Sequence, residues 1–392
     1  MGSTIDKGLG DMARGCSFAG LGRVVGLALA IALSGCASMP GMLTPVASSP
    51  EADRVDILTA TTRAPSDDTG LLYTGDRGNG VSFRNIVVSI PKRREVGTIQ
   101  FPERVPGNPA TDFVVTSATP VAKTNLAGWF RAAGGRKRRV FVFVHGFNTR
   151  FDRAVFRLAQ LAHDIDAEAA PVLFSWPSRG QVLDYRRDFD NASYSRSDLA
   201  DLLRTAAASR NIGEIIILAH SMGSWPAMEA IRQLALERGG VPPKITNLIL
   251  ASPDLDIGVF RRQVEDMGPR RPHMTLFVSH NDRALRLSRF IARGTTRLGG
   301  IDLTQEQYQQ QLAGLSGVQV LDLSAIGTEG DLNHDLFATS PDVVRLIGEQ
   351  LRHGQIATDS DSASPLAAAE TPVMAAGLLI TMPIRIFNTA AP

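Results

Sequence analysis

Residues 214–224 read Glu-Ile-Ile-Ile-Leu-Ala-His-Ser-Met-Gly-Ser, an apolar run that ends in a small polar turn. The run is short and rich in isoleucine, which is typical of a buried strand. Ser221 stands at the tip of the turn. The next stretch, 225–231, has helical character and carries Pro226 in its first turn, where a missing backbone N–H interrupts no helical hydrogen bond. The pattern predicts a strand, a sharp turn bearing a serine, and a helix.

This turn resembles the nucleophile elbow of α/β-hydrolases, in which the serine of a G-x-S-x-G motif stands clear of the sheet. Ala219 replaces the first glycine of the motif, and Gly223 keeps the second. Both positions are crowded where strand and helix pass, and alanine is small enough for the first of them. The resemblance identifies Ser221 as the candidate nucleophile and the backbone N–H of Met222 as one donor of an oxyanion hole.

Strands and helices alternate around the elbow. The apolar runs predict strands over Val140–Val144, Val172–Trp176, Ile215–Ala219, Ile245–Ala251, Met274–Ser279 and Val318–Leu323, with helical stretches between them. Short runs rich in β-branched residues between Leu71 and Phe101 predict antiparallel strands at the N-terminal side. We therefore expect an α/β-hydrolase fold, with a mostly parallel central sheet, helices on both faces and antiparallel N-terminal strands.

Two polar residues complete a catalytic set with Ser221. Open α/β sheets place their sites at the carboxyl ends of strands; Asp282 follows the strand Met274–Ser279, and His334 lies in a polar loop after Val318–Leu323. The chain order Ser221, Asp282, His334 is that of the α/β-hydrolase triad. Histidine takes the serine proton in such a triad, and the carboxylate fixes the histidine tautomer. Asp254, after the preceding strand, is the alternative acid.

Other strand ends supply the remaining candidates. The sequence His145-Gly146-Phe147 follows the strand ending at Val144 and is similar to the His-Gly turn of this superfamily, which makes the Phe147 N–H the second predicted oxyanion donor. We expect His145 to shape this turn rather than to transfer protons. The predicted pocket rim consists of His145, Trp176, Arg179 and Tyr185. For the last three, packing and substrate contact are equally open interpretations.

Several other chemistries find no support. His280 is a poor alternative base, because it lies two residues before the acid on the same turn. A metal site would draw on His145, His220, His280 and Asp282, yet the sequence has no H-E-x-x-H motif, phosphate loop or dinucleotide fingerprint. We expect no metal and no cofactor. The net charge of +2, from 41 basic and 39 acidic residues, gives no reason to expect a nucleic-acid partner.

The N-terminus has the pattern of an export signal. Three basic residues precede the apolar stretch Val24–Ala32, which is too short for an ordinary membrane span. The next four residues, Leu33-Ser34-Gly35-Cys36, resemble the bacterial lipobox. In that resemblance Cys36 carries lipid and becomes the first residue of the mature chain. Cys16 leaves with the leader, so no disulfide is predicted.

Two details refine this interpretation of the N-terminus. Alanine at position 37 implies outer-membrane sorting in the enterobacterial rule, so we expect a lipid-anchored protein of the bacterial cell envelope that faces the periplasm. Met12 is an alternative translation start, because the stretch before the apolar core is long for a leader.

The chain is thus expected to have four parts: a signal peptide at 1–35, a flexible linker at 36–70 from lipidated Cys36, a hydrolase domain at 71–353 and a low-complexity tail at 354–392. The linker is rich in Pro, Ser, Ala and Thr, the composition of a spacer. Within the tail, Val373–Ile384 is too short to span a bilayer, and we expect it to dock on the domain or to lack fixed structure.

The strand-end motifs together resemble a bacterial α/β-hydrolase family formerly listed as a domain of unknown function and described as esterase-like or lipase-like. The motifs are Val144–Asn148, Phe174–Gly180, Ala251–Asp254 and Ser279–Leu285, and the resemblance covers about Leu71 to Leu351. It implies the fold and a Ser-His-Asp triad but names no substrate.

We therefore predict a lipid-anchored serine hydrolase that cleaves carboxylic esters through an acyl-serine intermediate, with a lipid or an acylated envelope polymer as substrate. The alternatives are a non-catalytic envelope lipoprotein that uses the fold as an interaction module, and an acyltransferase.

Overall fold

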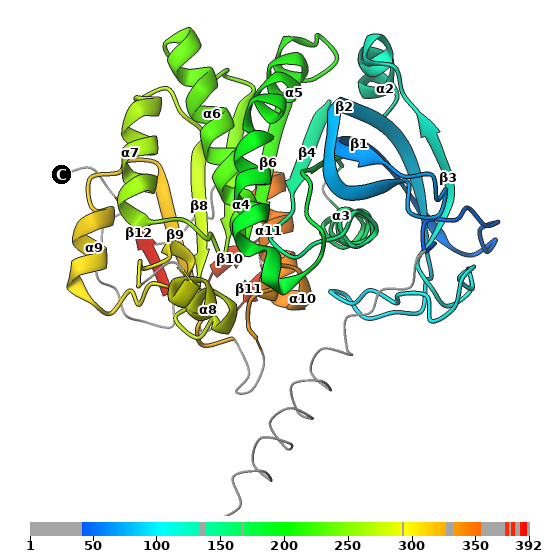
Figure 1. Cartoon of the computed structure of the whole chain (residues 1–392). Helices are drawn as coiled ribbons and strands as arrows, with labels where there is room; N and C mark the ends of the chain where they lie inside the picture. Colours follow the sequence, from blue (N-terminus) through cyan, green and yellow to red (C-terminus); the bar gives the residue numbers. More distant parts are fainter. Residues whose placement is uncertain are drawn as a thin grey trace, which may run out of the picture. The chain divides into compact units, whose positions relative to one another are not determined.

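Strand β6 (Glu214–His220) lies inside a sheet of ten strands formed by the described part of the chain (Figure 1). The strand order is β12-β9-β8-β7-β6-β4-β5-β1-β2-β3. All neighbours from β9 to β1 along this order pair in parallel. Strands β2, β3 and β12 are antiparallel to the strands beside them. The prediction of a mostly parallel sheet with antiparallel N-terminal strands is confirmed.

The structure is a computed structural model that describes residues 41–133, 138–166, 168–291, 294–326, 332–353, 373–375, 378–380 and 385–389. The strands are β1 (Asp53–Pro65), β2 (Tyr73–Ile90), β3 (Val114–Pro120), β4 (Arg139–Val144), β5 (Ala170–Ser175), β6, β7 (Ile245–Ala251), β8 (His273–Val278), β9 (Val318–Asp322), β10 (Val373–Ala375), β11 (Leu378–Ile380) and β12 (Arg385–Asn388). The α-helices are α2 (Leu126–Ala133), α3 (Phe151–Ile165), α4 (Tyr185–Tyr194), α5 (Arg196–Ala208), α6 (Ser224–Arg238), α7 (Ile257–Met267), α8 (Arg283–Ile291), α9 (Glu306–Leu312), α10 (Leu336–Thr339) and α11 (Pro341–His353). The short 3-10 helices are η1 (Lys123–Asn125), η2 (Val182–Asp184), η3 (Ser221–Gly223) and η4 (Leu298–Gly300).

Helices cover both faces of the sheet, and the side chains of β6 show why. Ile215 and Ile217 point into the core shared with α5, α6 and α7, whereas Ile216 and Leu218 point into the core shared with α3 and α11. Successive strand residues face opposite sides of a sheet, so a continuous apolar run requires cover on both. Figure 1 shows α5, α6 and α7 side by side along the strands. This double cover leaves the strand ends as the accessible edge.

The expected linker over 36–70 is wrong for Asp53–Pro65, which forms β1 in the interior of the sheet. Ala60 pairs with Phe83 of β2 on one side and with Phe174 of β5 on the other. The threonines of this stretch suggested a spacer by composition, but threonine is β-branched and favours strands. The N-terminal runs also needed correction, because residues 97–101 form no strand and the third antiparallel strand is β3.

The expected low-complexity tail also contributes to the sheet. Strand β12 pairs antiparallel with β9, with Phe387 opposite Val320. Phe387 is buried in the same core as the central helices. Strands β10 and β11 form a separate hairpin. The domain boundary at 353 is therefore wrong for β12, because a buried aromatic side chain holds this strand on the sheet edge.

The predicted signal peptide and Cys36 lie outside the described residues. Within the described part of the chain, no helix is both long and apolar enough to cross a membrane.

Candidate active site

Ser221 lies on a strained turn between β6 and α6. Its φ is +52°, a left-handed conformation that non-glycine residues seldom adopt. Two glycines make room for the turn. A Cβ on Gly223 would lie 2.3 Å from the carbonyl oxygen of His145, and a Cβ on Gly146 would lie 2.9 Å from the Cβ of Ser221. Ala219, which replaces the first glycine of the elbow, is fully buried. The sequence thus builds a tight elbow with the serine at its tip.

Asp282 and His334 come together at the ends of two neighbouring strands. Nδ1 of His334 lies 2.7 Å from Oδ2 of Asp282. The other carboxylate oxygen of Asp282 accepts a hydrogen bond of 2.9 Å from the backbone N–H of Leu285, at the start of α8. The backbone N–H of Arg283 donates to the carbonyl of Leu332 at 3.0 Å, which holds the histidine loop against α8. Asp282 is therefore held through both of its carboxylate oxygens, and the loop that carries His334 is held against α8.

The position of His334 suits proton transfer. Burial by itself would lower the pKa of His334, but the hydrogen bond and the charge of Asp282 outweigh burial, and the pKa is raised above its usual value. Nε2 of His334 makes no hydrogen bond to any residue that the structure describes, and neither does Oγ of Ser221. Such contacts are often long in unliganded enzymes and shorten when substrate binds.

His220 connects the elbow to the histidine loop. Its ring centroid is 4.7 Å from that of His334, and its Nε2 lies 3.3 Å from the His334 carbonyl oxygen. Burial and the neighbouring His334 lower the pKa of His220 to about 3, so this imidazole is neutral. Because His220 immediately precedes Ser221 in the chain, the contact joins the loop that carries His334 to the elbow.

The loop after β4 carries the predicted oxyanion donor Phe147. Its backbone N–H donates to no other residue in the described ranges. The preceding carbonyl, that of Gly146, lies 2.9 Å from Nδ1 of His145. A carbonyl and the next N–H belong to one rigid peptide unit and point in opposite directions. The His145 contact therefore fixes the direction of the Phe147 N–H.

His145 is a neutral structural imidazole in this geometry. Its ring stacks on Trp176 with centroids 4.8 Å apart, and burial, together with the charge of Arg63, lowers its pKa to about 3. Nε2 lies 3.3 Å from Nη2 of Arg63, which can only donate, so Nε2 accepts and Nδ1 carries the proton given to Gly146. Trp176 donates from Nε1 to the His145 carbonyl at 2.8 Å.

Arg63 is a residue that the sequence analysis missed, because it lies in the stretch assigned to a linker. Its side chain is buried, and it is paired with no carboxylate within the described residues. It contacts the loops after β4 and β5 and the start of β2. The acceptors are Ser175 Oγ at 2.8 Å, Ser178 O at 2.7 Å, Thr149 O at 2.8 Å, Thr74 O at 3.2 Å and His145 Nε2 at 3.3 Å. Burial lowers the pKa of Arg63 to about 9, so the side chain is charged at neutral pH.

Asp254, the alternative acid, belongs to a different network. It accepts hydrogen bonds from the Tyr185 hydroxyl at 2.9 Å and from Ser288 Oγ at 2.7 Å. Arg297 forms an ion pair with it at 3.0 Å. No hydrogen bond joins Asp254 to His334 among the described residues. The geometry favours Asp282 as the partner of the histidine, and nothing in the sequence pattern had indicated Ser288 or Arg297.

Tyr185 contacts both Asp254 and Phe147, and so links the hydrogen bonds around Asp254 to the loop after β4. Its ring packs edge to face on Phe147, with centroids 5.2 Å apart. Burial and the charge of Asp254 raise the pKa of Tyr185, so the hydroxyl stays protonated and donates. Arg179 instead lies on the surface and pairs with Asp76 at 2.7 Å. Three of the four predicted rim residues, His145, Trp176 and Tyr185, thus contact the loop after β4.

The alternative base His280 and a metal site have no supporting arrangement among the described residues. His280 is exposed. No group of three or more His, Cys, Asp or Glu side chains in the described ranges could hold a metal ion.

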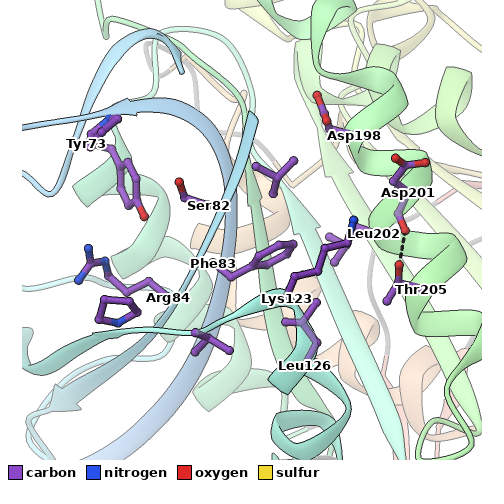
Figure 2. Close-up of a pocket in the computed structure, with 14 residues that line it drawn as sticks. Tyr73, Ser82, Phe83, Arg84, Lys123, Leu126, Asp198, Asp201, Leu202 and Thr205 are labelled. Atoms are coloured by element: carbon purple, nitrogen blue, oxygen red, sulfur yellow. Dashed lines mark hydrogen bonds between the residues drawn. The ribbon is translucent and has the colours of Figure 1, made fainter. Parts of the chain in front are cut away.

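A cavity of about 480 Å³ lies between β2 and α5, with Phe83 and Arg84 on one wall and Asp201 and Leu202 on the other (Figure 2). None of the predicted site residues lines this cavity.

Comparisons with known proteins agree with the fold. A family model described as "Alpha/beta hydrolase of unknown function (DUF900)" matches residues 122–350. An uncharacterized protein of Nostoc sp. is 29% identical over 122 residues, which cover 25% of this chain and 32% of that protein. The chain therefore spans about a third of the length of the curated relative it matches.

Two similar solved structures are named a dienelactone hydrolase and a carboxyl esterase. Dienelactone hydrolase from Anabaena variabilis is 14% identical, with a TM-score of 0.36 over 70% of this chain and 93% of its own. Carboxyl esterase 2 from Tuber melanosporum is 12% identical, with a TM-score of 0.37 over 84% of this chain and 97% of its own.

Proposed function

The chain belongs to the α/β hydrolases of unknown function (DUF900), and from this membership and the geometry at Ser221 we propose that it is a serine hydrolase of carboxylic esters. The observation that carries the proposal is the 2.7 Å contact between His334 and Asp282, next to a serine held at a φ of +52°. The strained serine conformation costs about 1–3 kcal/mol, and such strain occurs most often at functional sites.

In the proposed reaction, Ser221 Oγ attacks the ester carbonyl carbon while Nε2 of His334 takes the hydroxyl proton. The tetrahedral oxyanion accepts hydrogen bonds from the backbone N–H groups of Phe147 and Met222, and each such donor is worth about 10²–10³-fold in rate. His334 gives its proton to the departing alcohol, which leaves an acyl-Ser221. Water then attacks the acyl group, His334 takes the water proton and returns it to Ser221, and the carboxylic acid leaves.

Labelling with a fluorophosphonate probe tests the nucleophile. We expect the probe to label the wild-type protein, and we expect Ser221→Ala and His334→Ala to lose both labelling and release of p-nitrophenol from p-nitrophenyl esters. Circular dichroism serves as the control that both variants are folded. A folded wild-type protein that resists the probe would contradict the proposal and favour a non-catalytic interaction module.

We also propose that Cys36 carries lipid and anchors the protein in the bacterial cell envelope, at the outer membrane facing the periplasm. The support is the lipobox-like sequence Leu33-Ser34-Gly35-Cys36 after a basic and apolar leader. Two or more lipid chains hold a protein stably at a membrane. An ester hydrolase in this position would act on lipids or on acylated envelope polymers.

A further inference from the structure

The surface around the triad carries large apolar side chains that are open to solvent. The three most exposed in the described part of the chain are Leu183 at 98%, Phe290 at 82% and Leu332 at 65%. Each of them lies in a segment that follows a parallel strand, where the site residues also lie. With their exposed neighbours they form what we call the apolar rim: Val182, Leu183, Leu287, Phe290, Ile291 and Leu332.

Hydrogen bonds connect the parts of this rim to one another and to the site. The Tyr185 hydroxyl lies 2.9 Å from Ser288 Oγ, so η2 and the start of α4 are fixed to α8. The backbone N–H of Arg283 holds Leu332 at 3.0 Å. Asp282 immediately precedes α8, and His334 lies two residues after Leu332. Figure 1 shows α8 beside the start of α4 at one end of the sheet.

Helix α8 has an inner and an outer face. Leu285 and Ser288 are buried against the domain, whereas Leu287, Phe290 and Ile291 are exposed. The sequence Arg-Ala-Leu-Arg-Leu-Ser-Arg-Phe-Ile contains three arginines and no acidic residue. An outer face that combines apolar and basic side chains is typical of helices that lie in the plane of a membrane interface.

We propose that the apolar rim docks on the surface of an anionic lipid bilayer, which would bring lipid esters to Ser221. This inference rests on the proposed ester hydrolase activity for its substrate, but the docking itself does not depend on catalysis. Large exposed apolar patches on a protein mark interaction surfaces. The exposed Arg286, Arg289 and, at the start of α4, Arg186 lie among the apolar side chains and complement the charge of acidic headgroups. The acidic residue of η2, Asp184, is half-buried, whereas these three arginines are exposed.

A fluorescent probe on the rim tests the docking. The chain has only two cysteines, Cys16 and Cys36, so the full-length Cys16→Ser/Cys36→Ser/Ser221→Ala protein accepts one probe at a chosen position. We would place an NBD label at Phe290→Cys. The matched control is Leu236→Cys, which is also exposed but lies twelve residues along α6 from its start and thus about 18 Å from the elbow.

We expect vesicles of phosphatidylcholine and phosphatidylglycerol to shift NBD emission at position 290 to the blue and to raise its intensity at least twofold, with no change at position 236. Arg286→Gln/Arg289→Gln should raise the lipid concentration for half of this change at least threefold. No response at position 290, or an equal response at position 236, would overturn the proposal. Equal responses to vesicles with and without phosphatidylglycerol would overturn its electrostatic part.

Activity gives a second test. In Leu183→Ser/Phe290→Ser, the ratio of hydrolysis of a long-chain ester in vesicles to hydrolysis of a soluble short-chain ester should fall at least tenfold. Leu236→Ser removes an exposed apolar side chain near the far end of α6 and should leave the ratio unchanged. An unchanged ratio in the rim variant contradicts the docking. Absence of all hydrolysis contradicts the proposed function instead, and the NBD result still decides the docking.

Discussion

In the proposed reaction, the hydrogen bond and the charge of Asp282 help to set the pH range in which His334 would act as a base. Asp282 stabilises the imidazolium and so raises the pKa of His334, in spite of the burial that opposes it. The base must be neutral to take the serine proton. Activity should therefore rise with pH through the raised histidine pKa and should be lost below it.

We expect Asp282→Asn to shift the acid limb of the kcat/KM profile to lower pH, because the pKa of His334 falls when its carboxylate partner is removed. The same change should lower kcat by about 10⁴-fold, since an amide favours the wrong tautomer. Steady-state kinetics from pH 5 to pH 9 measures both effects. Asp254→Asn is the matched control, and it should shift the acid limb less than Asp282→Asn does, because the charge of Asp254 raises the pKa of His334 less than Asp282 does. A shifted limb in Asp254→Asn alone would assign the acid to Asp254.

Sequence pattern predicts some site residues because their signal is local. Ser221 stands in a strand–turn–helix motif, and Asp282 and His334 follow buried strands in the chain order of the triad. Arg63 gives no such signal, because its role depends on acceptors from distant loops that meet only in the folded chain. The composition of the stretch around Arg63 even suggested a flexible linker. For the same reason the sequence does not predict a role for Arg297, because its partner Asp254 lies 43 residues earlier in the chain.

Among the elements, β1 helps to hold the loop after β4, which carries the proposed oxyanion donor Phe147. It pairs on both sides and places Arg63 beneath the loops after β4 and β5. The apolar runs of β4 to β9 were predictable from sequence, since a buried parallel strand is continuously apolar. Strand β1 is mixed in composition, and β12 is short, so neither has the periodicity that identifies a strand.

We expect Arg63→Lys to lower the free energy of unfolding by about 2–4 kcal/mol, because lysine has three donors where arginine serves five acceptors, and each buried acceptor left alone costs about 1–3 kcal/mol. Urea denaturation measures the change. In the folded variant kcat should fall more than KM changes, since the loosened loop carries the proposed oxyanion donor Phe147.

Arg54→Lys is the control for this prediction, because Arg54 is an exposed arginine of the same strand and its substitution should stay within about 0.5 kcal/mol. Equal stability of the two variants would mean that Arg63 does not hold the loops together.

At the scale of the whole molecule, the proposed lipid anchor and the apolar rim are complementary. A single membrane-binding signal gives reversible attachment, whereas two signals give stable attachment. The anchor would keep the protein at the membrane, and the rim would orient the carboxyl edge of the sheet towards the lipid.

The anchor is tested by acylation of the chain in a bacterial host that processes lipoproteins. We expect the wild-type protein to incorporate an alkyne-bearing palmitate and to lose the mass of its leader, whereas Cys36→Ala does neither, because the thiol that would carry the lipid is gone. Cys16→Ala is the matched control, since Cys16 precedes the expected cleavage point and its loss should leave labelling intact. Palmitate on the Cys36→Ala chain, or none on the wild type, would remove the anchor and leave the rim as the proposed contact with the membrane.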